Sequence, residues 1–211
     1  MRVLIAPDKF KGSLTAEEAA AAMAQGVLSV YPDADVTRIP VADGGEGTLE
    51  AALAAGAEER STRVRGPLGR EVTAVWAMDG TTAVLETARS SGLMLVEPSV
   101  QTSLAASSFG SGQLITAALD AGAQEIILGI GGSAMTDGGS GALTALGLRI
   151  LDDGGNPVPP GGAGLAVAAA VDASGLDPRI KDTTIRIAAD VTNPLTGHNG
   201  AAHVFGGQKG A

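Results

Sequence analysis

The chain has 211 residues, 45% of them hydrophobic and 2% aromatic, with no cysteine and a formal net charge of −9 at pH 7. This composition excludes a disordered chain, disulfides and thiolate zinc sites, and it argues against nucleic-acid binding, which needs a basic surface or stacking rings. The apolar run Val3–Ala6 is too short for a signal-peptide core and no segment reaches the ~20 apolar residues of a membrane span, so we expect a cytoplasmic protein without a membrane partner.

The first 55 residues predict two strands, each followed by a helix. Thr15 and Glu18 form a capping box that opens the first helix, and prolines end both strands. This order is typical of parallel strands with helical crossovers. The expected elements are strands at Arg2–Ala6 and Val36–Ile39 and helices at Thr15–Val30 and Thr48–Ala55.

Between residues 60 and 86 the pattern changes to strands with no helix between them. Gly-Pro and Asp-Gly turns join three candidates, which predicts an antiparallel patch and a domain boundary near residue 65. The candidates are Arg60–Arg65, Glu71–Met78 and Thr82–Glu86.

Alternation of helices and strands resumes after residue 86, interrupted by a proline-glycine loop at 152–164. The fold class is therefore α/β, with mostly parallel sheets and a short antiparallel patch. The expected elements are helices at Gly112–Ala121 and Gly141–Leu146 and strands at Glu125–Leu128, Leu148–Leu151 and Ile185–Ala189.

Three loops combine glycines with acidic or amide residues where a strand ends, at 41–48, 129–139 and 190–197. Glycine lets backbone N–H groups approach a ligand closely, and such groups beside carboxylates suit a phosphate ester and its magnesium ion. The carboxyl ends of strands are where open α/β sheets bind ligands. We therefore expect a phosphate-handling site at this edge.

The loop 129–139 has two interpretations. Gly129, Gly131 and Ala134 match the dinucleotide fingerprint, and Asp152 lies where a ribose-binding acid would be, which favours a nicotinamide enzyme. The fingerprint requires a helix after Ala134, however, and glycines at 138, 139 and 141 each cost a helix about 1 kcal/mol. We prefer a long loop in which Gly131, Gly132 and Ser133 cradle anionic oxygens, with Thr136 as a further donor and Asp137 as a magnesium ligand or a helix cap.

The loop 41–48 places two carboxylates three residues apart around Gly44 and Gly45. Asp43 and Glu46 could share one magnesium ion, which takes one or two protein carboxylates. Alternatively, Glu46 or Thr48 opens the following helix as a cap.

Two further groups of polar residues are candidates for binding. Asp8, Lys9, Lys11 and Ser13 follow the first strand and precede a capped helix, which suits an anion, although a solvated loop would look the same. Glu86, Ser107 and Ser108 are weaker polar candidates, and Trp76 is expected in the core.

The C-terminal region adds a carboxylate and a lysine. Asp190, at a strand end, is the best candidate for a catalytic carboxylate. Asn193 and Asn199 could position substrate or simply form turns. Lys209 could neutralise phosphate or be an exposed tail residue. We expect surface or packing roles for His198 and His203, which have no cysteine companions.

These motifs lie in four segments, Ala6–Leu14, Pro40–Thr48, Gly129–Gly139 and Asp190–Ala211. In order and spacing they resemble the signature segments of the bacterial type I glycerate kinases. The resemblance implies phosphorylation of D-glycerate by ATP, with Mg²⁺, most often to 2-phosphoglycerate. It also implies two α/β domains, the first flavodoxin-like, with the active site in the cleft between them.

The family's members continue for roughly as long again, so we expect residues 1–65 to be part of the first domain and residues 66–211 to be an incomplete second domain. A core that lacks strands exposes apolar surface, which leaves homo-oligomerisation open. For the reaction, we expect Lys11 and Lys209 to neutralise charge, Asp43 and Asp137 to bind Mg²⁺, and Asp190 to act on the attacking hydroxyl.

Three alternatives stay open at this point. The phosphorylated hydroxyl could be the 3-hydroxyl, because the two products differ only in the pose of the acid. The fingerprint-like loop keeps a nicotinamide oxidoreductase as a rival. A truncated, non-catalytic ligand-binding fragment is the third.

Overall fold

The computed structural model describes residues 1–8, 10, 13–39, 41 and 47–211. It confirms the predicted α/β class. The strands are β1 (Arg2–Ile5), β2 (Asp35–Arg38), β3 (Glu58–Arg65), β4 (Glu71–Asp79), β5 (Thr82–Glu86), β6 (Glu125–Gly129), β7 (Arg149–Leu151), β8 (Ala170–Asp172) and β9 (Thr184–Ala188). The helices are α1 (Ala16–Val30), α2 (Thr48–Ala54), α3 (Thr87–Ser91), α4 (Val100–Ala105), α5 (Phe109–Asp120), α6 (Ser140–Ala145) and α7 (Ala201–Phe205). Short 3₁₀ helices are η1 (Leu93–Leu95), η2 (Gly162–Val167), η3 (Pro178–Asp182) and η4 (Gly207–Lys209).

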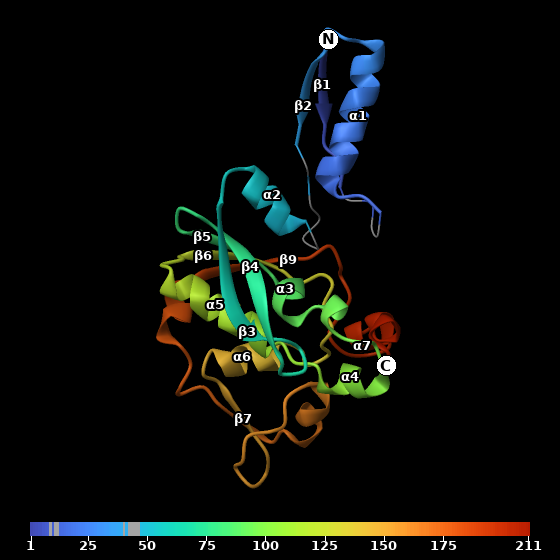
Figure 1. The fold of residues 1–211 in the computed structure, drawn as a ribbon. Helices are drawn as coiled ribbons and strands as arrows, with labels where there is room; N and C mark the ends of the chain where they lie inside the picture. The colour runs from blue at the N-terminus through green and yellow to red at the C-terminus, as the bar shows by residue number, and fades with distance from the viewer. Residues whose placement is uncertain (9, 11–12, 40, 42–46) are drawn as a thin grey trace.

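A five-stranded sheet in the order β3-β4-β5-β6-β9 forms the centre of the molecule (Figure 1). The strands β3, β4 and β5 pair antiparallel, whereas β5, β6 and β9 run parallel. The antiparallel patch predicted between residues 60 and 86 is therefore confirmed. The parallel half places the ends of β5, β6 and β9 at one edge of the sheet.

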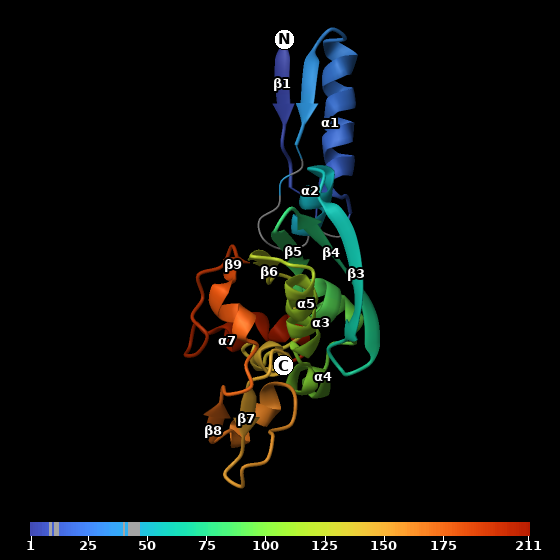
Figure 2. The ribbon, with the colours of Figure 1, turned by 90° about the vertical axis from the view of Figure 1, so that its left-hand side faces the viewer.

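The segment β1-α1-β2 stands at one end of the molecule, beyond α2, in both ribbon views (Figures 1 and 2). Its strands pair in parallel, as predicted, and α1 packs on them through Ile5, Ala20 and Ala24. The predicted capping box opens α1: the Glu18 amide donates to Thr15 Oγ1 at 3.1 Å, and the Thr15 amide donates to Glu18 Oε2 at 2.8 Å.

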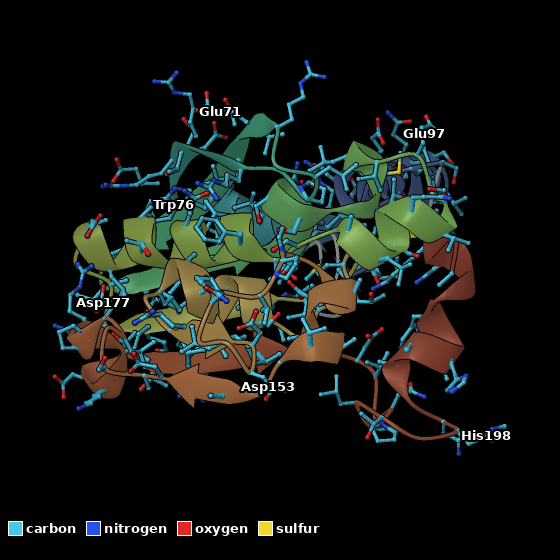
Figure 3. All side chains as sticks on the ribbon, turned by 90° about the horizontal axis from the view of Figure 1, so that it is seen from below. Glu71, Trp76, Glu97, Asp153, Asp177 and His198 are labelled. Carbon is cyan, nitrogen blue, oxygen red and sulfur yellow. The ribbon has the colours of Figure 1, made fainter. Side chains whose placement is uncertain are left out.

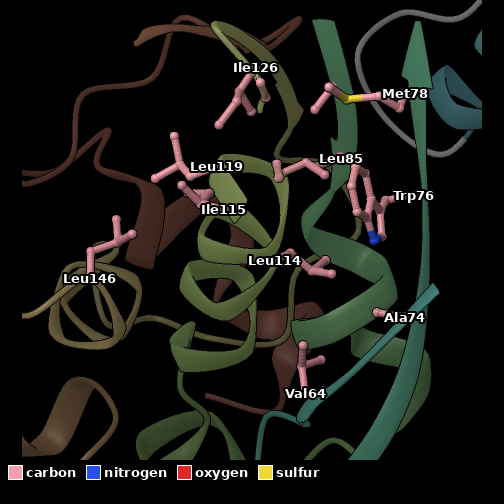
Figure 4. Packing of buried hydrophobic residues seen from close by; sticks show 13 residues of the cluster. Val64, Ala74, Trp76, Met78, Leu85, Leu114, Ile115, Leu119, Ile126 and Leu146 are labelled. Atoms are coloured by element: carbon pink, nitrogen blue, oxygen red, sulfur yellow. The ribbon is translucent and has the colours of Figure 1, made fainter. Parts of the chain in front are cut away.

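The main core lies between α5 and one face of the central sheet (Figure 4). Trp76 is buried there, as expected, and its indole donates to Thr62 Oγ1 at 3.0 Å. Because side chains alternate along a strand, the neighbouring residue Ala77 faces the other way and packs against Leu49 of α2. Thus α5 and α2 cover opposite faces of the same sheet.

The pairing of β3 with β4 indicates where the boundary between the two domains lies. All eight residues of β3 pair with β4, from Glu58 opposite Met78 to Arg65 opposite Glu71. Residues 58–65 thus share a sheet with residues that the sequence assigns to the second domain. We propose that the boundary lies between β2 and α2, ahead of the predicted position at residue 65.

The strand predicted at 148–151 is present as β7, and it pairs antiparallel with β8, which was not predicted, in a two-stranded sheet separate from the central one. The helices α3, α4 and α7 were not predicted either, because five or six residues are too few to show a helical period. No helix within the described residues is long and apolar enough to cross a membrane.

Candidate functional site

The ends of three parallel strands lie in one row. In the sheet register Glu86 of β5 pairs with Gly129 of β6, and Gly129 pairs with Ala188 of β9. The loop 129–139 and the loop that begins at Asp190 therefore leave the same edge of the sheet. This is the ligand-binding edge expected for parallel α/β sheets.

The loop after β6 is fastened to the turn after α3. The Leu93 amide donates to the Gly132 carbonyl at 2.8 Å, and the Ala134 amide donates to the Ser91 carbonyl at 2.9 Å. Gly132 has a φ of 65°, which favours glycine. No helix begins until Ser140, so the prediction of a long loop in place of a fingerprint helix is confirmed.

Asp137 is almost completely buried, and both oxygens of its carboxylate accept hydrogen bonds from nearby groups. Oδ2 accepts from the Ser108 amide at 2.8 Å, the Ser108 hydroxyl at 2.9 Å and the Gly141 amide at 3.2 Å, and Oδ1 accepts from the Gly139 amide at 3.1 Å. This geometry suits the cap that the sequence offered as an alternative to a magnesium ligand. Thr136 is likewise occupied, because its hydroxyl donates to the Ser103 carbonyl at 2.8 Å.

Lys209 is buried against the same loop. Its ammonium donates to Ser133 Oγ at 3.1 Å and to the Met135 carbonyl at 2.7 Å. Burial lowers the pKa of Lys209, an effect that the nearby Asp137 carboxylate partly opposes. The structure therefore joins Lys209 to Ser133, two residues predicted to bind phosphate, although 76 positions separate them.

Glu86 has a larger role than the sequence suggested. Its side chain is 2% exposed, and Oε1 accepts from the amides of Gly47 and Leu49, each at 3.0 Å. A carboxylate at a helix N-terminus satisfies amides that have no partner within the helix. Glu86 therefore caps the first turn of α2, a role that was not predicted from the sequence, while Glu46 lies outside the described residues.

Arg89 completes a charged cluster around Glu86 that sequence reasoning missed. Its Nε donates to Glu86 Oε2 at 3.1 Å, and its Nη2 donates to Glu50 Oε1. Desolvation would lower the pKa of Arg89, but the two carboxylates outweigh it and raise that pKa. The sequence signal was an arginine three positions after a strand-end acid.

A cleft of about 890 Å³ lies between the start of α1 and the edge of the central sheet. The predicted residues Ser13 and Gly132 line it, together with Gly47, Glu86 and Arg89. This volume is in the range of small-molecule sites. Other predicted residues are not part of its lining; they are Gly131, Ser133, Asp137, Asp190, Asn193, Asn199 and Lys209.

The loop after β9 is exposed from Asp190 to Asn199. The side-chain Nδ2 of Asn193 donates to the backbone carbonyl of Asn199 at 3.2 Å, so this contact closes a turn. His198 and His203 are exposed, and His198 lies at the margin of the molecule in Figure 3, far from Trp76. Their surface placement agrees with the expectation from sequence.

Some of the predicted residues cannot be placed. Lys9, Lys11, Asp43, Gly44, Gly45 and Glu46 lie outside the described residues. Asp8 lies within them, three residues after the end of β1. Among the side chains that the structure does describe, no three His, Asp or Glu residues converge as a metal site. Mg²⁺ needs only one or two protein carboxylates beside phosphate oxygens and water, and the exposed Asp190 suits that donor set.

Comparison with known proteins identifies the family. A model described as the glycerate kinase family matches residues 3–211. The chain belongs to the glycerate kinase family. It is 52% identical over 215 residues to glycerate 2-kinase of Escherichia coli K12 and 50% identical over 214 residues to glycerate kinase of Bacillus subtilis 168.

The match covers the chain but only part of each relative. Each alignment spans 100% of this chain and 56% of the relative, so the chain spans little more than half the length of these curated proteins. A crystal structure assigned as glycerate kinase 2 from Salmonella typhimurium LT2 is 49% identical, with a TM-score of 0.88 over 100% of this chain and 58% of its own. The fold described above is therefore that of the corresponding part of a glycerate kinase.

Proposed function

We propose that this chain supplies the phosphate-handling edge of a kinase that transfers a phosphoryl group from ATP to D-glycerate, giving 2-phosphoglycerate. One observation carries the proposal: Glu86, Gly129 and Ala188 end neighbouring parallel strands in register. The loop 129–139 and the segment that carries Asp190 therefore leave the same edge of the sheet, and Glu86 holds the first turn of α2 near that edge. Membership of the family and the names of its relatives support the same activity.

Phosphoryl transfer depends mainly on positioning and on neutralising charge. In this proposal the loop amides around Gly132 face anionic oxygens, and Lys209 holds that loop in place through Ser133. Asp190 orients the attacking hydroxyl or accepts its proton. Mg²⁺, held by Asp190 and by phosphate oxygens, would neutralise the negative charge of the transferred group. Asp43 and Glu46 stay candidates for the same ion.

The remaining parts of the proposal follow from the family and the sequence. Its partners are ATP and D-glycerate, with no nucleic acid or membrane involved, and its location is the cytoplasm. Homo-oligomerisation stays a prediction that sedimentation velocity can check.

The decisive experiment measures ADP release with D-glycerate and Mg-ATP, for this chain and for the full-length Escherichia coli relative. Adding enolase and pyruvate kinase without a phosphoglycerate mutase distinguishes the products, because enolase acts on 2-phosphoglycerate and not on 3-phosphoglycerate. We expect pyruvate to form without the mutase. If it forms only with the mutase, the 3-hydroxyl is the acceptor. If this chain releases no ADP while the relative does, this chain by itself is not a catalyst.

The structure disfavours the nicotinamide enzyme that the fingerprint-like sequence suggested, because no helix directly follows Ala134. Titration with NADH, followed by its fluorescence, tests that candidate directly. We expect no enhancement, because Gly138 and Gly139 lie where the dinucleotide fold requires a helix.

A further inference from the structure

Arg89 is distinctive among the residues that line the cleft. Of the lining residues that the structure describes, Glu17, Glu18, Glu50 and Glu86 are acidic and Arg89 alone is basic. Its side chain is 38% exposed, so it is accessible from the cleft. A substrate that carries anionic groups would meet this guanidinium first among the described lining residues.

The guanidinium is held firmly on one side. Glu86 accepts from Nε at 3.1 Å, and Glu86 is itself fixed by the amides of Gly47 and Leu49. Among the described residues nothing accepts a hydrogen bond from Nη1. A planar guanidinium with free N–H groups matches the paired oxygens of a carboxylate or phosphate.

Glu50, the other carboxylate that binds the Arg89 guanidinium, is far more exposed than Glu86. The Glu50 side chain is 54% exposed, whereas that of Glu86 is 2% exposed. Exposed ion pairs contribute little to stability, so the Glu50 contact is easily exchanged. Chemically, the Glu50 carboxylate resembles the group that a small acid would present.

We propose that Arg89 is a substrate-binding residue for a carboxylate or phosphate group, with Glu86 as its fixed support and Glu50 as a carboxylate that the ligand displaces. The assignment rests on the proposed function and deepens it, because it names the group that recognises the anionic end of a substrate. Glu50 then competes with the ligand for one guanidinium edge.

The proposal predicts that two substitutions, R89Q and E50Q, change ligand affinity in opposite directions. Isothermal titration calorimetry with D-glycerate and, separately, with Mg-ADP is performed on the wild-type chain, E50Q and R89Q. We expect R89Q to weaken binding of one ligand by about tenfold or more, because the charged hydrogen bonds are lost. We expect E50Q to tighten binding of the same ligand by about threefold, because a competing negative charge is removed. The ligand that responds identifies its source: D-glycerate indicates a carboxylate, and Mg-ADP a phosphate.

Two further variants separate binding from folding. R89K keeps the charge but not the planar pair of donors, so its affinity should fall close to that of R89Q while its melting temperature stays near the wild-type value. R63Q is the matched control, because Arg63 forms an exposed pair with Glu71 at 3.5 Å on the β3-β4 hairpin and does not line the cleft. It should leave both affinities unchanged.

A purely structural role for Arg89 predicts a lower melting temperature without any change in affinity, and that result overturns the assignment. A decrease of affinity in E50Q as large as that in R89Q overturns it as well, because Glu50 would then support binding. If the wild-type chain binds neither ligand, the proposed function fails together with this assignment. If the wild-type chain binds and R89Q binds equally well, only this assignment fails.

Discussion

The two loops that leave neighbouring strands β6 and β9 use their polar residues in different ways. In the loop 129–139, Asp137 is 1% exposed and its carboxylate accepts hydrogen bonds from Ser108, Gly139 and Gly141. In the loop after β9, Asp190 is exposed. A carboxylate that is saturated by buried donors maintains the shape of its loop, whereas an exposed one at a strand end is available to a ligand. The same residue type thus has two different environments in two loops that leave neighbouring strands.

The largest expected effect is on Asp190. Asp190→Asn should lower turnover with D-glycerate by about 10³-fold, because the amide neither accepts the hydroxyl proton nor carries charge. Since the side chain is exposed, the free energy of unfolding should change by less than about 0.5 kcal/mol. Assays of ADP release and urea denaturation check both values, and turnover near the wild-type rate would remove Asp190 from the site.

For Asp137 the expected effect is on stability. Asp137→Ala leaves the amides of Ser108, Gly139 and Gly141 and the Ser108 hydroxyl without their acceptor, which should cost about 3 kcal/mol of unfolding free energy. Urea denaturation measures this loss. The control is Asp153→Asn, at an exposed position (Figure 3), which should change stability by less than about 0.5 kcal/mol. A stable Asp137→Ala variant with a reduced affinity for Mg²⁺ would favour the metal-ligand interpretation.

For Lys209 the expected effect is on stability and on its dependence on pH. Lys209→Met should cost about 1–2 kcal/mol, because Ser133 and the Met135 carbonyl lose their charged donor. Burial holds the pKa of Lys209 in the folded protein below its ordinary value of 10.5, which applies to the unfolded chain. At pH values between the folded-state pKa and 10.5, the unfolded chain therefore binds the proton more strongly than the folded protein does. Wild type should therefore gain stability relative to Lys209→Met as pH rises through this window. Unfolding curves of both proteins, recorded from neutral pH up to the ordinary lysine pKa of 10.5, test this sign, and a difference that shrinks with rising pH would contradict it.

The smallest effect is expected at Asn193. Its side chain is exposed and, within the part of the chain that the structure describes, donates one hydrogen bond, to the Asn199 carbonyl. Asn193→Ala should therefore lower the free energy of unfolding by about 0.5 kcal/mol or less. If Asn193 positions substrate, the KM for D-glycerate rises while the stability stays nearly constant. An unchanged KM would leave Asn193 as a turn residue.

The sequence predicted much of the architecture from local signals. The helix α1 was marked by its capping box, and the strands β5 and β6 by short β-branched runs that end at glycines or acids. Such signals span only a few neighbouring residues, so they can be read without knowledge of the fold. They placed the loops 129–139 and 190–197 at strand ends correctly, whereas most of the loop 41–48 lies outside the described residues.

The roles of individual polar residues depended on contacts between distant parts of the chain. Glu86 meets the Leu49 amide 37 positions away, and Lys209 meets Ser133 across 76 positions. In the sequence Asp137 could be a metal ligand or a cap, and the donors from Ser108, 29 positions earlier, favour the cap. Sequence patterns fixed which segments become strands and loops, because those preferences are local. Only tertiary packing decided which side chains are buried against donors and which stay open to a ligand.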